Sequence, residues 1–78
     1  MNATATRELR WTIRASFDLR GAVKRQLRAF CWNNAFDIDI EEERGWFASM
    51  LLIRIVVPVS EAKHVEWAVS RWLEESRR

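Results

Sequence analysis

Residues 47–59 are the most hydrophobic stretch of the chain, and they predict one long β-strand that is apolar on both faces. A strand buried on one side only alternates apolar and polar residues, because successive side chains point to opposite faces of the sheet. One face of this strand carries Phe47, Leu51, Ile53, Ile55, Val57 and Val59. The other carries Trp46, Ala48, Met50, Leu52 and Val56, and only Arg54 interrupts it. One face suffices for the core of a small domain, so the second face predicts a partner.

Two other segments alternate apolar and polar residues and therefore predict half-buried strands. The first covers residues 9–17 and the second covers residues 36–41. Residues 42–45 predict a turn before the long strand, in which Gly45 is free to adopt a positive φ. Pro58 has no backbone N–H to donate, so it marks either the end of the long strand or an edge.

Apolar residues spaced three or four apart predict two amphipathic helices, over about residues 19–32 and 61–76. Asp18 and Ser60 precede these segments, and both residue types accept hydrogen bonds from the free amides of a helical first turn. We therefore expect them to be the N-caps. Residues 33–34, both asparagine, are expected to end the first helix.

The resulting order is β-α-β-β-α, which predicts the α+β fold class. We expect a two-layer sandwich with an antiparallel sheet of order 1-3-2 and both helices on one face. This arrangement resembles a ferredoxin-like plait that lacks its last strand, and the likeness implies no function. The strand at residues 9–17 then keeps an unpaired edge. We expect residues 7–78 to form a single domain after a disordered lead-in at residues 1–6.

The length of 78 residues makes self-association attractive on energetic grounds. A domain of this size buries only about 60% of the surface of its unfolded chain, so it gains from a disulfide, a metal or oligomerisation. One cysteine and one histidine exclude an internal disulfide and a four-ligand zinc site of these residues. No apolar run approaches the roughly 20 residues of a spanning helix, and the N-terminus has no signal region, so we expect a cytoplasmic protein.

Charge is distributed unevenly along the chain. Residues 1–34 carry a net charge of +5, whereas residues 35–78 carry −3, which together give the overall +2. Such asymmetry indicates either an anionic partner for the first half or charge complementarity between two halves or two copies.

The sheet face away from the helices is expected to carry three strips of different character. The outer strips hold Arg10, Thr12, Arg14 and Ser16 on one side and Asp37, Asp39 and Glu41 on the other. Between them lie Met50, Leu52, Arg54 and Val56. Two such faces stacked antiparallel bury the apolar ridges and pair the charged strips, so we predict a homodimer by face stacking or by edge pairing. The expected interface residues are Arg10, Arg14, Trp46, Met50, Leu52, Arg54 and Val56.

A basic row on the first helix supports an alternative function. Its members are Arg20, Lys24, Arg25 and Arg28, with Trp32 continuing the row. Cations beside an aromatic ring contact phosphates and stack on bases, so this face is a candidate for nucleic-acid binding. A solvated helix face explains the same row, the second half of the chain is acidic, and no recognised nucleic-acid motif is present.

The second helix carries a further candidate patch. His64, Trp67 and Arg71 share the side opposite its apolar stripe, so they form either a contact patch, for a partner or an anionic aromatic ligand, or a tryptophan resting on its neighbours. Trp46, Met50, Leu52 and Val56 are candidates for lining a pocket between subunits that takes a planar apolar ligand.

Catalytic chemistry has little support in the sequence. Cys31 and His64 are the obvious nucleophile and base, and they lie near the ends of separate helices. Asp37 and Asp39 share a strand face, where an acid–base pair or a divalent cation is conceivable, although a solvated face opposite Arg54 explains them. We therefore predict no catalytic residues, no cofactor and no metal. The expected function is a small non-enzymatic, self-associating binding or adaptor domain, with nucleic-acid binding as the alternative.

Overall fold

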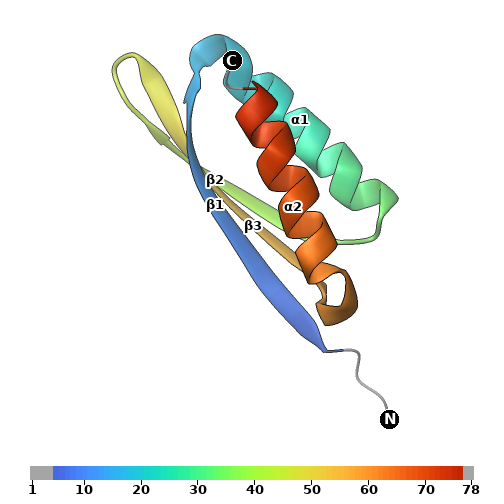
Figure 1. Cartoon of the computed structure of the whole chain (residues 1–78). Coiled ribbons are helices and arrows are strands. Elements are labelled where there is room, and N and C mark those ends of the chain that lie inside the picture. The colour runs from blue at the N-terminus through green and yellow to red at the C-terminus, as the bar shows by residue number, and fades with distance from the viewer. Residues whose placement is uncertain (1–4, 77–78) are drawn as a thin grey trace.

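The strands and helices follow one another in the order that the hydrophobic pattern predicts. The computed structural model describes residues 5–76. Its elements are β1 (Thr6–Ser16), α1 (Phe17–Asn33), β2 (Asp37–Arg44), β3 (Ala48–Pro58) and α2 (Val59–Ser76). The strands form one antiparallel sheet of order β1-β3-β2, which confirms the predicted fold class and strand order. The helices run side by side along the sheet (Figure 1).

The central strand β3 holds the sheet together because it pairs along its length with β1 and over most of its length with β2. Its pairing with β1 runs from Thr6 opposite Pro58 to Ser16 opposite Ala48. Its pairing with β2 runs from Asp37 opposite Val56 to Arg44 opposite Ser49. Both outer strands therefore have an edge that no described strand pairs with.

The core lies between the helices and one face of the sheet. This face consists of the odd-numbered residues of β1 and β3, together with Ile38 and Ile40 of β2. The fully buried side chains with the largest volumes are Leu51, Ile53, Ile55, Val23, Val57 and Val65. They belong to one cluster to which both helices contribute, so the helices and a single face of the sheet enclose the hydrophobic core.

Several boundaries differ from the sequence prediction. The N-cap of α1 is Ser16, whose Oγ accepts a hydrogen bond from the Leu19 amide at 3.3 Å, so the prediction of Asp18 was wrong. Helix α2 already includes Ser60, so that residue is not its N-cap. The amide of Val59 donates to the Ala5 carbonyl at 3.0 Å, which joins the first residue of α2 to the residue before β1.

Two residues expected on the buried face of the long strand lie beyond its ends. Phe47 precedes β3 and is 84% exposed, and Val59 opens α2 and is 52% exposed. Alternation along a strand predicts burial only while the chain remains in the sheet. Of the expected lead-in, Thr6 belongs to β1, and residues 1–4 lie outside the described residues.

The turn between β2 and β3 needs glycine for a reason other than a positive φ. No described glycine has a positive φ, so Gly45 does not use that freedom. Its amide donates to the Ala48 carbonyl at 2.9 Å, and a Cβ at position 45 would lie 2.8 Å from that same oxygen. Residue 45 must therefore lack a side chain because the backbone approaches too closely.

The end of α1 stores backbone strain at Ala35. The Phe36 amide donates to the Cys31 carbonyl at 2.8 Å and the Ala35 amide to the Trp32 carbonyl at 3.2 Å, which is the pattern of a Schellman motif. Ala35 has φ of 58°, in the left-handed region that favours glycine. The Phe36 ring packs edge-on against Phe30 at 6.1 Å between centroids, which fastens the following strand to the helix.

Replacing Ala35 with glycine is expected to stabilise the protein by about 0.5–1 kcal/mol, because glycine adopts this φ without a Cβ penalty. Urea unfolding followed by circular dichroism measures the change. Ala29→Gly is the matched control, since Ala29 lies exposed inside α1, where glycine costs about 1 kcal/mol. Equal effects of the two substitutions would contradict the strain at Ala35.

Candidate functional site

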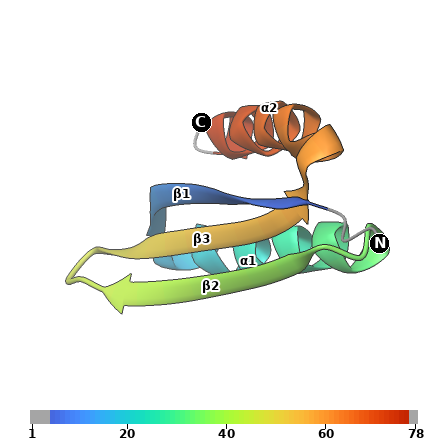
Figure 2. The ribbon, with the colours of Figure 1, turned by 90° about the horizontal axis from the view of Figure 1, so that it is seen from below.

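The face of the sheet opposite the helices is left uncovered. Figure 2 shows α1 behind the strands, and no described element lies in front of them. The pairing register arranges the side chains of this face in four rows across the sheet. These rows are Glu8–Val56–Asp37, Arg10–Arg54–Asp39, Thr12–Leu52–Glu41 and Arg14–Met50–Glu43. We call this surface the open face.

An apolar ridge runs along the middle of the open face. Met50 is 36% exposed, and Leu52 and Val56 are half-buried. Arg54 interrupts the ridge, but its charge is compensated, since its guanidinium lies 3.5 Å from Asp39 and 3.8 Å from Glu8. The ridge and both charged strips therefore lie where the sequence predicts them.

Some charges of the open face have no ion-pair partner within residues 5–76. Glu8 pairs with both Arg10 and Arg54, and Arg54 also pairs with Asp39, so two cations and two carboxylates near one end of the face compensate one another. Arg14 on β1 and Asp37, Glu41 and Glu43 on β2 belong to no ion pair of the described chain. One edge strand carries a free cation and the other carries free carboxylates. The face is therefore complementary to a surface on which the positive and negative strips lie in the opposite order.

The turn between β2 and β3 exposes two aromatic rings at one end of this long molecule. Trp46 is 92% exposed and Phe47 is 84% exposed. Figure 1 shows this hairpin extending past the helices, and the molecule measures 49 Å along its longest axis. Trp46 and Met50 line a shallow groove here with Arg14, whereas Leu52 and Val56, expected in the same pocket, lie further along the ridge.

On the other side of the sheet, Glu42 forms ion pairs with two residues of the basic row of α1. Its carboxylate accepts hydrogen bonds from Lys24, from Arg20 at 2.7 Å and from the buried Ser49 hydroxyl at 2.9 Å. Arg44 lies 3.5 Å away. Arg20 and Lys24, placed on a nucleic-acid surface by the sequence prediction, are thus half-buried and engaged by β2.

This environment strongly favours the ionised carboxylate. Hydrogen bonds from Lys24 and Ser49, together with the positive charge of Arg20, lower the pKa of Glu42 from 4.5 to about 2 and outweigh its partial burial. The remaining members of the basic row, Arg25 and Arg28, are exposed, as is Trp32 at 85%.

The candidate patch on α2 is exposed and partly organised. Trp67 is 61% exposed, and the guanidinium of Arg71 lies 5.4 Å from the centre of its ring. Arg71 also lies 3.3 Å from Glu75 one turn later, which leaves its charge partly compensated. His64 is exposed on the same helix.

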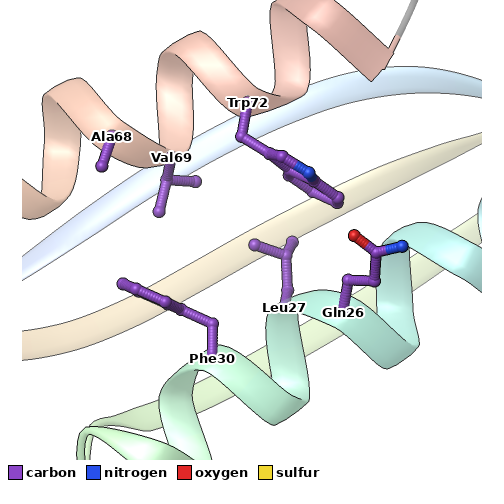
Figure 3. A pocket seen from close by; sticks show the side chains of 6 residues that line it. All are labelled: Gln26, Leu27, Phe30, Ala68, Val69 and Trp72. Carbon is purple, nitrogen blue, oxygen red and sulfur yellow. The ribbon is translucent and has the colours of Figure 1, made fainter.

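A groove between the helices was not anticipated from the sequence. It has a volume of about 310 Å³ and is lined by Gln26, Leu27, Phe30, Ala68, Val69 and Trp72. Figure 3 shows these side chains facing one another from α1 and α2. Leu27 and Val69 form its buried floor. The sequence does not show how far apart the two helices pack, so it could not predict which side chains line this groove.

Cys31 is unsuited to nucleophilic chemistry because it is fully buried. Burial raises the pKa of its thiol to about 11, so the reactive thiolate is scarce at neutral pH. Within residues 5–76 there is no group of three or more His, Cys, Asp or Glu side chains arranged to hold a metal ion. None of the helices in this part of the chain is both long and apolar enough to cross a membrane.

A scan against protein-family models, a search of the curated proteins and a search of the solved structures find no match for this chain. The candidate site is therefore defined by the exposure, register and charge of its own residues. By these criteria the open face is the surface on which the most predicted site residues meet. It brings together Arg10, Arg14, Met50, Leu52, Arg54 and Val56, with Trp46 at the hairpin end.

Acid is expected to destabilise the fold through Glu42. The folded state holds this group at a pKa of about 2, below the ordinary 4.5, so its stabilisation is complete above pH 4.5 and is lost as pH falls toward 2. Glu42→Gln is expected to lower the melting temperature at pH 7 and to flatten the decline between pH 5 and pH 2. Thermal unfolding across this range measures both effects.

Glu66→Gln provides the matched control for this experiment. Glu66 lies exposed on α2, away from the open face, with no ion pair in the described chain. Its substitution should leave the acid dependence of the melting temperature unchanged. An unaltered acid profile for Glu42→Gln would show that the cluster contributes nothing to stability.

Proposed function

We propose that this chain is a small, non-enzymatic, self-associating binding module in which a second copy covers the open face. The observation that carries the proposal is the ridge of Met50, Leu52 and Val56 on a three-stranded sheet whose helices occupy the other side. Solvent-facing strand positions are normally polar, so a row of apolar side chains there favours a covering partner. The buried, unreactive Cys31 suits the cytoplasmic setting that we assume.

The area available favours a reversible dimer. Three strands about 4.8 Å apart and eight residues at about 3.3 Å each span roughly 400 Å² in projection. A standard interface buries about 800 Å² of accessible surface on each partner. The open face reaches this area only with its protruding side chains and the hairpin tip, so we expect the dimer to dissociate on dilution.

Edge pairing through β1 is the other route to a dimer. If the chain is a ferredoxin-like plait without its last strand, β1 keeps the edge that this strand would occupy. Pairing two β1 edges would satisfy backbone groups but leave Met50 and Leu52 in water. Face stacking removes these apolar groups from water, which favours it over edge pairing.

Nucleic-acid binding remains the alternative, with less support. Only Arg25, Arg28 and Trp32 of the basic row are exposed, because Glu42 engages Arg20 and Lys24. The four rows of the open face also contain no aromatic side chain on which bases stack, and β2 lines the face with carboxylates. Salt-sensitive binding of DNA or RNA that is lost in Arg28→Glu would favour this alternative.

Leu52→Glu is expected to convert the dimer to a monomer without unfolding it. Leu52 lies in the middle of the ridge, and a carboxylate there would be desolvated beside that of Glu41 whenever two faces meet. Sedimentation velocity at 100 µM measures the association state, and circular dichroism confirms the fold.

Trp67→Glu is the matched control, since it also replaces an exposed apolar side chain, on α2. It should leave the dimer intact. Loss of the dimer in Trp67→Glu, with Leu52→Glu unaffected, would move the interface to α2 and contradict the proposal.

A further inference from the structure

Four carboxylates of β2 lie on the open face and restrict how two such faces can meet. Asp37, Asp39, Glu41 and Glu43 form a continuous column along one side of the face. Only Asp39 has an ion-pair partner in the described chain, namely Arg54. Placing this column against its own copy would bring eight carboxylates together, and like charges facing each other across an interface are strongly unfavourable.

Two arrangements of aligned sheets have two-fold symmetry, and they differ in which strands face each other. An axis perpendicular to the strands stacks the copies antiparallel and places β2 over β2. An axis parallel to the strands exchanges the sides of the sheet, so that β1 of each copy lies over β2 of the other. The order β1-β3-β2 places β3 over β3 in both cases. The antiparallel stacking expected from the sequence would therefore not pair the charged strips.

We infer that the two copies are related by an axis parallel to the strands, with β1 of each copy covering β2 of the other. The inference rests on the proposed dimer. Such an axis also sets the register between the two copies. Rotation about it does not shift residues along the strand direction, so each row faces the same row of the other copy. The row Arg14–Met50–Glu43 then faces its own copy in reverse order, so Arg14 meets Glu43 twice. Arg10 meets Asp39 twice in the row that contains Arg54. These four contacts between opposite charges outnumber the like-charge contacts of the same arrangement, in which Glu8 meets Asp37 twice and Arg54 meets its own copy once.

The same arrangement places both hairpin tips at one end of the dimer. The tips carry Trp46 and Phe47 from each copy, and the intervening ridges meet along β3. A surface of four exposed aromatic rings then belongs to neither copy alone. An axis perpendicular to the strands would instead place the tips at opposite ends.

Charge reversal in separate chains tests the arrangement. Arg14→Glu and Glu43→Arg should each weaken the dimer by at least about tenfold, because each places two like-charged pairs in the interface. An equimolar mixture of the two variants should restore association to within about threefold of the wild type, since both contacts regain opposite charges. Sedimentation velocity at matched concentrations measures all three samples, and circular dichroism confirms that each is folded.

Arg28→Glu is the matched control, because it reverses an exposed charge on α1 away from the open face. It should leave the dimer unchanged. A monomeric wild-type chain would overturn the proposed function itself. A wild-type dimer whose variants associate normally, or whose mixture does not recover, would overturn this arrangement and leave self-association standing.

The position of the hairpin tips gives a second, independent measurement. Spin labels on Phe47→Cys should lie on the order of 20 Å apart in the dimer, given sheets about 10 Å apart and the length of the labels. Native Cys31 is fully buried and does not compete for the label. A distance approaching the 49 Å length of the molecule would contradict the parallel axis.

Discussion

The structure depends on an imbalance between the layers: two helices cover one face of a three-stranded sheet, and no described element covers the other. The large buried side chains of β3 all point toward the helices. Its alternate side chains are also largely apolar, because Met50, Leu52 and Val56 occupy the open side. A strand at the centre of a sheet supplies both faces at once, so the chain encodes more apolar surface than its own helices bury.

Charge serves two separate purposes on the two sides of the sheet. On the helix side, Glu42 ties β2 to Arg20 and Lys24 of α1, which fixes the helix over the sheet. On the open side, Arg14 and Glu43 stand at opposite edges without partners in the described chain. The charges of the first set already form ion pairs within the folded chain, whereas those of the second set are available for recognition. Contacts within one chain therefore explain part of the uneven charge distribution along the sequence.

Most of the fold could be predicted from alternation and helical spacing, because these patterns directly report which side of an element is buried. The same logic could have placed Glu42: it shares the parity of Ile38 and Ile40, so its side chain must face α1. Residues 42–45 were predicted to form a turn, but β2 continues to Arg44, so Glu42 lies in the strand. Alternation could not identify Ala35 as left-handed, since alanine carries no such preference, nor the exposure of Phe47, which follows from where the strand begins.

The open face is the part of the site that the sequence predicted best, and the groove between the helices is the part that it could not predict. Face membership follows from residue parity, whereas a groove depends on the separation of packed helices. The central claim is that the open face is covered in solution by a second copy. Sedimentation equilibrium of the wild-type chain between 1 and 500 µM tests it most directly. We expect the mass to fall from twice the monomer value toward the monomer value on dilution, and a monomer at every concentration would contradict the account.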